Sequence, residues 1–236
     1  MLPVKKPGVL VNRLLATLPG KDQQQILAKC ESVELRLAEV ISEPGDSIRQ
    51  VYFPTDSFVS LVTPPDHHAG LEVGLVGSEG MVGTPLILGV EVTALRTFVQ
   101  GAGPAWCMTP DRFQDALKQS SALRATLDRY LYVLMSQLAQ MVACTRFHLV
   151  EARLARWLLM TQDRAHSDCF HVTHEFLAFM LGVRRVGVTK AASALQRRQL
   201  IRYSRGDITV LDRAGLQAAA CGCYGSAEGL YDQIMG

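Results

Sequence analysis

The sequence predicts an α+β protein with an N-terminal antiparallel β-roll or sandwich, a long helix, and a C-terminal winged helix-turn-helix. Three observations predict it. Short β-rich runs between residues 33 and 108 are separated by turn residues. Apolar residues step at helical spacing from about 121 to 146, and two helical patterns joined at Gly182 precede an alternating stretch. Several short strands at this spacing are typical of all-β sandwiches and rolls rather than of βαβ units.

The composition is that of an ordinary globular chain. Of the 236 residues, 48% are apolar and 19% are charged, which argues against disorder. Six scattered cysteines favour reduced thiols over a disulfide framework. No apolar run approaches the roughly 18–20 residues of a membrane span, and the start MLPVKKPGVLVNRLL lacks the apolar core of a signal peptide. We therefore expect a cytoplasmic protein with no membrane partner.

The first half is expected to begin with a short helical region over residues 11–30, broken at Pro19-Gly20. The β-rich runs that follow are VELRLAEVI, SIRQVYFP, SFVSLVT, LEVGLVG, ALRTFVQG and PAWCM. The turn segments between them carry Pro, Gly and Asp, as in EPGD and GSEG. We expect residues 1–120 to form one domain, with a short helix PDRFQDALKQS at its end.

A long helix is predicted from Ser120 or Ser121 to about Arg146. Its apolar positions cover about half of the circumference, which indicates two packing partners. One is the β domain, and the other is the same helix of a second subunit; burial within a single chain is the alternative. The residues expected on the dimer helix, 121–147, are Leu123, Leu127, Tyr130, Leu134, Leu138 and Met141.

The third domain is expected over residues 148–236. It opens with the helix HLVEARLARWLLMTQDRA, which has a basic side at Arg153 and Arg156. Thr173 is a suitable N-cap for the next helix, which stops at Gly182. A second helix, roughly 184–198, follows after a few residues, and two helices joined by a tight turn with Gly are the helix-turn-helix signature. Its inward positions are expected to be Val188, Ala191, Ala192 and Leu195.

Basic residues concentrate in this last region. Residues 184–213 hold eight Lys/Arg against two Asp, so the segment carries +6 and the remainder −4 of the total +2. A localised basic segment indicates a polyanion site, with a solvated charged face as the alternative. LIRYSRGDITVLD reads as a hairpin, or wing, with Arg205-Gly206-Asp207 at its turn. Its basic residues would contact the DNA backbone. The residues expected to bind DNA are Thr173, Arg184, Arg185, Val186, Gly187, Thr189, Lys190, Ser193, Arg202 and Arg205.

Over almost its full length the chain resembles the CRP/FNR superfamily of bacterial transcription regulators. SEPGDSIRQVYFPTDSFVSLV is similar to the family's β-roll, the helix from Ser121 to its dimer helix, and VTHEFLAFMLGVRRVGVTKAASALQRRQLIRYSRGDITVLD to its winged helix-turn-helix. The resemblance implies a double-stranded β-helix that receives an effector, a homodimer, a palindromic operator and contact with RNA polymerase. The recognition arginine matches Arg185 and the downstream basic residue Lys190. Val186 replaces the glutamate of cyclic-AMP-responsive members, so the base sequence it recognises must differ.

The effector pocket departs from the cyclic-nucleotide pattern. Gly83 is in place, but Thr84-Pro85 stand where Glu-Leu is expected, and Arg96-Thr97 are displaced by one position. Leu138 and Ala139 replace the hydroxyl residues that contact the purine. Too few polar groups remain for a buried nucleotide, so we expect an effector other than cyclic AMP or cyclic GMP, or none. The candidate pocket residues are Gly80, Gly83, Thr84, Arg96 and Thr97.

No cofactor, metal or catalytic site is expected. Cys30 and Cys107 do not form an iron–sulfur set, and the spacing in HSDCFHVTH matches no common zinc motif. Cys221 and Cys223 form a lone C-x-C, interpreted as inert thiols. His67-His68 are expected in a solvated turn. A β-roll or cupin-like enzyme is a remote alternative, for which Glu72 and Glu79 near that histidine pair are the only candidate ligands.

Overall fold

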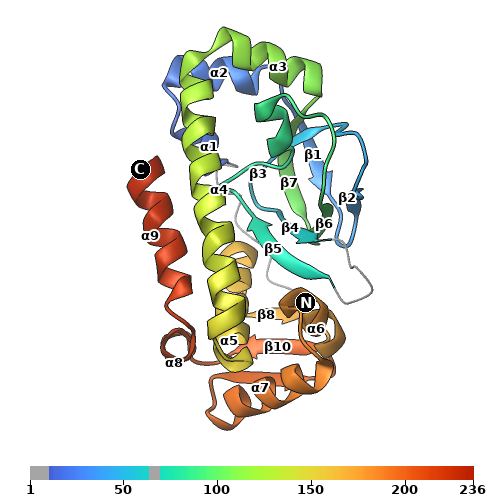
Figure 1. Ribbon diagram of the computed structural model, residues 1–236, viewed down its shortest axis with the longest axis vertical. Coiled ribbons are helices and arrows are strands. Elements are labelled where there is room, and N and C mark those ends of the chain that lie inside the picture. The colour runs from blue at the N-terminus through green and yellow to red at the C-terminus, as the bar shows by residue number, and fades with distance from the viewer. Residues whose placement is uncertain (1–10, 64–69) are drawn as a thin grey trace.

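Two antiparallel sheets pack face to face in the N-terminal half of the molecule (Figure 1). The computed structural model describes residues 11–63 and 70–236, so His67-His68 lie outside the described residues. One sheet has the strand order β2-β6-β4-β5 and the other β1-β7-β3. The strands are β1 (Glu31–Leu35), β2 (Val40–Ser42), β3 (Val51–Pro54), β4 (Phe58–Thr63), β5 (Leu71–Val76), β6 (Arg96–Gly101) and β7 (Gly103–Met108).

Apolar side chains from both sheets share one core, which includes Leu35 of β1, Val59 of β4 and Val99 of β6. Alternating side chains of β3 serve two cores, because Tyr52 packs on this one while Val51 and Phe53 face the helices. The predicted β-roll is confirmed.

Short helices close one end of the roll. The expected break at Pro19-Gly20 separates α1 (Arg13–Ala16) from α2 (Gly20–Leu27), and the 3-10 helix η1 (Thr84–Leu88) follows β5. The helix α3 (Pro110–Gln119) has Pro in its first turn and Thr109 as its N-cap, whose side chain accepts from the Arg112 amide.

The helix α4 (Ser121–Phe147) runs along the roll and continues to the C-terminal half (Figure 1). The Ser120 hydroxyl caps it by accepting from the Leu123 amide at 3.0 Å. Leu123, Leu127 and Tyr130 are fully buried within the protomer, so these three residues of the expected dimer set are not available to a partner. None of the helices in the described part of the chain combines the length and the apolar composition that crossing a membrane requires.

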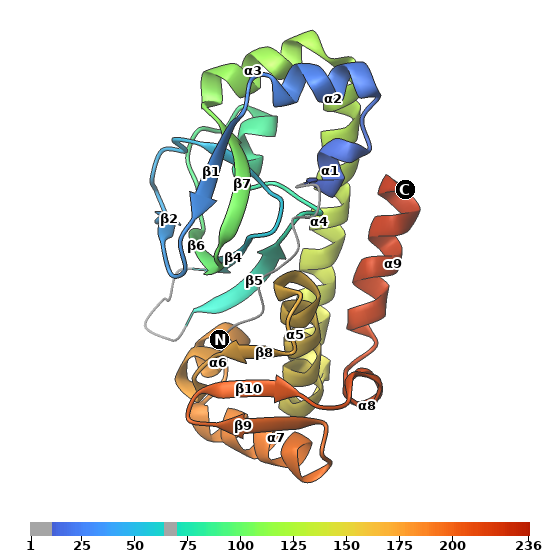
Figure 2. The same cartoon turned by 180° about the vertical axis from the view of Figure 1, so that it is seen from behind.

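A second side of α4 is apolar and exposed. Met135, Leu138 and Val142 follow one another at helical spacing and are 66%, 44% and 70% exposed. Of the expected dimer residues only Leu138 belongs to this stripe, because Leu134 and Met141 are half-buried. The C-terminal helix α9 (Cys223–Met235) lies alongside α4 in both views (Figures 1 and 2), and it packs on another side of α4 than this stripe, near the buried Tyr130.

The C-terminal half combines helices with a small sheet of order β8-β10-β9 (Figure 2). Its elements are α5 (Val150–Ala165), β8 (Cys169–His171), α6 (His174–Leu181), α7 (Arg185–Arg197), β9 (Ile201–Ser204), β10 (Asp207–Val210) and α8 (Arg213–Ala219). One apolar core joins them, with Leu154, Leu177 and Leu195 completely buried. The expected basic side of α5 is wrong, because Arg153 and Arg156 are only 6% and 7% exposed.

Candidate functional site

The helix-turn-helix is built from local signals at the ends of α6. The Thr173 hydroxyl accepts from the Phe176 amide at 3.1 Å and caps the start of α6. Gly182 ends the helix in the left-handed conformation, with φ of 60°, which glycine adopts without the cost that a Cβ adds. Arg184 is the N-cap residue of α7, and its side chain makes no capping hydrogen bond. The first backbone amides of α7 can therefore donate to an external acceptor.

The N-terminal half of α7 separates a packed side from an exposed side. Val188, Ala191, Ala192 and Leu195 are buried, as expected from their spacing. The exposed residues of the expected DNA set on this element are Arg184, Arg185, Val186, Thr189, Lys190 and Ser193. Val186 is 59% exposed, so it is not packed against the protein. Gly187 is half-buried, and a Cβ added there would meet nothing within 4 Å. Another macromolecule can therefore approach the backbone at this position closely.

Some basic residues of this region are paired and others are not. The Arg198 Nη1 lies 3.0 Å from Glu151, and the Arg213 Nη2 lies 2.7 Å from Asp163. Among the residues that the structure describes, no salt bridge engages the basic residues of the proposed DNA face. They are Arg184, Arg185, Lys190, Arg202 and Arg205. These side chains keep their charge available for an external anion.

Thr189 has contacts inside the motif. Its hydroxyl donates to the Arg185 carbonyl at 3.1 Å and lies 3.0 Å from Nδ1 of His174. Since the hydroxyl proton is already used, the His174 ring donates from Nδ1. The ring stacks on Tyr203 of β9 at 4.2 Å, and burial together with the charge of Arg185 lowers its pKa. This contact holds the start of α7 on the first strand of the wing.

The wing is the hairpin of β9 and β10. Its two turn residues, Arg205 and Gly206, both have positive φ, 53° and 91°, as a two-residue hairpin turn requires. The expected turn included Asp207, which instead begins β10 and lies 2.9 Å from His171 Nδ1. Arg205 at the tip and Arg202 on β9 are exposed. The wing and α7 lie together at the end of the molecule remote from the roll (Figures 1 and 2).

The structure brings together only part of the expected effector residues. A cavity of about 180 Å³ within the roll is lined by Gly83, Thr84 and Thr97. Arg96 does not line it, because neighbouring strand residues point to opposite faces and its Nε lies 3.3 Å from Glu43. Gly80 packs elsewhere, against the Tyr130 hydroxyl.

The polar lining of the cavity in the roll differs from the one expected. Among the described residues that line it, Arg49 is the one cation and no carboxylate is present. The side-chain oxygen of Gln50 is buried there and has no hydrogen-bond partner among the described residues. The amide side chain thus offers an unused acceptor to whatever occupies the cavity.

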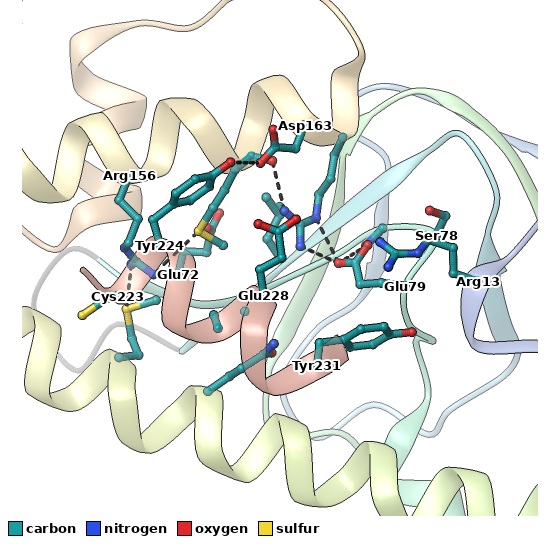
Figure 3. A pocket seen from close by; sticks show the side chains of 18 of the residues that line it. Arg13, Glu72, Ser78, Glu79, Arg156, Asp163, Cys223, Tyr224, Glu228 and Tyr231 are labelled. Carbon is teal, nitrogen blue, oxygen red and sulfur yellow. Dashed lines mark hydrogen bonds and ion pairs between the residues drawn. The ribbon is translucent and has the colours of Figure 1, made fainter. Parts of the chain in front are cut away.

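A second cavity, of about 240 Å³, lies between the roll, α4, α5 and α9 (Figure 3). Sequence reasoning missed it because its lining comes from segments far apart in the chain. Arg164 Nε donates to Glu79 at 3.0 Å within it. Burial alone would raise the pKa of Glu79, but the Arg164 charge and hydrogen bonds hold it below its usual value. Glu79 is one of the two carboxylates considered above as ligands of a β-roll enzyme, and its charge is compensated by Arg164.

The other carboxylate, Glu72, forms no ion pair with any residue that the structure describes. It lies on β5 and is 4% exposed, and the Ser60 hydroxyl donates to it at 3.1 Å. Burial raises its pKa to about 7, although Ser60 and the more distant Arg156 act in the opposite direction. The cavity therefore holds one carboxyl group that titrates near neutral pH.

Comparisons with known proteins agree with this geometry. Residues 152–219 match the model of the Crp-like helix-turn-helix domain. No curated protein sequence matches the chain. Its structure is similar to FixK2 from Bradyrhizobium japonicum, with a TM-score of 0.67 at 13% identity over 82% of this chain and 98% of that chain.

Two further solved structures show the same fold. A CRP/FNR-family transcriptional regulator from Thermus thermophilus aligns with a TM-score of 0.66 at 22% identity, covering 80% of this chain and 98% of that one. The c-di-GMP-responsive global regulator CLP from Xanthomonas campestris also aligns with a TM-score of 0.66, at 17% identity over 81% and 99%. The chain therefore carries a Crp-like helix-turn-helix domain within the fold of the CRP/FNR transcription regulators.

Proposed function

We propose that the protein is a homodimeric transcription regulator of CRP/FNR type that binds DNA sequence-specifically. The observation that carries the proposal is the exposed start of α7 beside the basic wing. Its Arg184, Arg185 and Lys190 form no salt bridge within the described part of the chain, and α7 itself holds no acidic residue. Such a helix enters the major groove with its first residues towards the base edges. The domain match over residues 152–219 supports the same function.

Each part of this surface has a role in the proposed complex. Arg185, in the first turn of α7, pairs with a guanine, which offers two acceptors to one guanidinium. The exposed Val186 is suited to contact with a thymine methyl group. Arg202 and Arg205 of the wing contact phosphates, which fix the register without specifying sequence.

The exposed stripe of α4 is the proposed dimer interface. It is formed by Met135, Leu138 and Val142 with the half-buried Leu131. Burial of such a side chain contributes about 1.5–3 kcal/mol, and the symmetric contact of two helices suits a two-fold axis. The dimer would place two α7 helices on the half-sites of a palindrome. Such a regulator works with RNA polymerase in the cytoplasm.

A second candidate function is regulation by a small molecule in the 180 Å³ cavity of the roll. The unused acceptor of Gln50 and the guanidinium of Arg49 favour it. The absence of a carboxylate among the described lining residues argues against a ribose-binding nucleotide site. We expect no calorimetric binding of cyclic AMP or cyclic GMP, and tight binding of either would overturn this part.

Arginine variants in a DNA-binding assay test the main proposal. Arg185→Ala is expected to cost about 1–3 kcal/mol and to relax specificity at one base pair, while Arg202→Ala weakens binding to all sequences evenly. Arg112→Ala is the matched control, since Arg112 pairs with Glu31 on the roll. Equal effects of all three variants, or binding that does not respond to salt, would contradict the proposal.

A further inference from the structure

Four potential metal ligands meet where α4, α5 and α9 approach one another. Cys144 lies in the last turn of α4, and His148 is the C-cap residue of the same helix. Cys221 lies between α8 and α9, and Cys223 begins α9. Their ligand atoms all lie within 4.8 Å of one another. Three of the four residues, the cysteines, are buried.

The distances fit a single tetrahedral ion. Zinc binds cysteine sulfur at about 2.3 Å and histidine nitrogen at about 2.0–2.1 Å, so a tetrahedron separates its ligand atoms by about 3.5–3.8 Å. The Sγ atoms of Cys144 and Cys221 are 3.6 Å apart, and Cys223 Sγ lies 3.5 Å from His148 Nδ1. A disulfide would need a sulfur separation of about 2.05 Å. Two of the separations therefore match a tetrahedral site, and the others, all within 4.8 Å, leave the ligand atoms close enough to converge on one ion.

The four residues form two pairs, and the members of each pair are close in sequence. Cys144 and His148 are four residues apart at the end of α4, so they face the same side. Cys221 and Cys223 are separated by one residue. The first pair joins α4 to α5, and the second joins α8 to α9, so one ion would link the two segments.

The surroundings supply positive charge. Glu72 lines the same cavity as Arg156 and interacts with it through its charge, but the two form no salt bridge among the described residues. Arg153 and Arg156 of α5 are more than nine-tenths buried, and among the described residues neither forms a salt bridge. The Nε atoms of both lack a hydrogen-bond partner, and Arg156 contacts the Met141 sulfur at 3.3 Å. Arg156 and Cys223 border the same cavity (Figure 3).

An anionic metal centre would neutralise part of this charge. Three thiolates and a neutral histidine around a divalent ion carry a net charge of −1. Arg153 Nη2 donates to the Leu181 carbonyl, but a buried arginine without a carboxylate partner is costly. The outer surroundings of a metal tune its ligands. Arg153 and Arg156 therefore have the position and charge of groups that stabilise such a centre.

We propose that Cys144, His148, Cys221 and Cys223 bind one zinc ion per protomer in a closed structural site. Four protein ligands leave no open coordination position, which distinguishes a structural site from a catalytic one. The ion fixes α9 against α4 and holds the junction from which α5 begins the DNA-binding half. The site was not expected from the sequence, since its two halves are 73 residues apart between His148 and Cys221.

Metal content and a cobalt spectrum test the site directly. Protein expressed in zinc-supplemented medium without a histidine tag is expected to contain about one zinc per protomer by elemental analysis. Replacement by Co²⁺ is expected to give the visible absorption of a tetrahedral ion together with thiolate charge-transfer bands. Wild-type protein without zinc and without a tetrahedral cobalt spectrum would overturn the proposal.

Variants assign the ligands. Cys221→Ser with Cys223→Ser is expected to abolish the signal, and His148→Ala alone to weaken zinc binding by at least about tenfold, given the roughly 10–100-fold losses caused by outer-sphere changes. Cys169→Ser is the control, because Cys169 is exposed and outside the cluster. Full zinc in the double variant would overturn the assignment. If that variant is misfolded by circular dichroism, the His148→Ala titration decides in its place.

Discussion

Replacing Glu72 by a neutral side chain tests how strongly the cavity between the roll and the helices raises the pKa of this carboxyl. The folded protein holds this carboxyl with a pKa of about 7, against its ordinary value of 4.5, because burial penalises the charged form. The folded state therefore binds the proton more tightly than the unfolded state. Stability from this group is present below about pH 4.5 and is lost as the pH rises through 7. The difference between the folded and unfolded pKa values corresponds to about 3 kcal/mol of unfolding free energy.

Glu72→Gln retains the shape of the protonated side chain and cannot ionise. In urea unfolding, the variant should match the wild type at about pH 4 and exceed its unfolding free energy by up to about 3 kcal/mol at about pH 8.5. Glu228→Gln is the control, because Glu228 lines the same cavity but is exposed. If Glu72→Gln and the wild type lose stability in parallel between these pH values, the carboxyl is already solvated and the reasoning fails.

Three other predictions address the α4 stripe, α7 and the metal. The double variant Met135→Asp/Val142→Asp should be a folded monomer in sedimentation experiments, because both positions are exposed, whereas Asp at a buried position would unfold the protein. A dimer that persists would contradict the proposed interface. Gly187→Ala should keep or raise stability by up to about 1 kcal/mol yet weaken DNA binding, because the added methyl meets DNA and not protein; unchanged affinity counts against close approach. Chelation of zinc should lower the melting temperature of the Cys169→Ser variant, which keeps the proposed site, but not that of Cys221→Ser/Cys223→Ser, which lacks two of its ligands. Equal shifts in the two variants would refute the zinc site.

Local signals made the helix-turn-helix predictable. Thr173 caps α6 and Gly182 ends it, both through contacts within a few residues. The inward set of α7 follows from helical periodicity alone. The strands of the roll were equally predictable from the sequence, because turn residues separate each β-rich run from the next.

Features that depend on tertiary packing could not be predicted in the same way. The apolar residues of α4 cover two sides, and periodicity does not say which side its own domain uses; Tyr130 proved to be internal and Met135 external. Arg96 is displaced by one position from the family arginine in sequence, and the pleat of β6 turns it to Glu43, so Arg49 lines the cavity instead. The cysteine cluster needs α9 to return along α4, which no local pattern indicates.

Selection of binding sites from random double-stranded DNA with the native full-length protein tests the central proposal most directly. Two α7 helices on a symmetric dimer should enrich a two-fold-symmetric motif whose half-sites lie about 10–10.5 base pairs apart. Affinity for the selected site should fall steeply as salt rises, because several arginine and lysine contacts to phosphate release counterions. No enriched motif, or a single asymmetric half-site bound with little response to salt, would contradict a dimeric sequence-specific regulator.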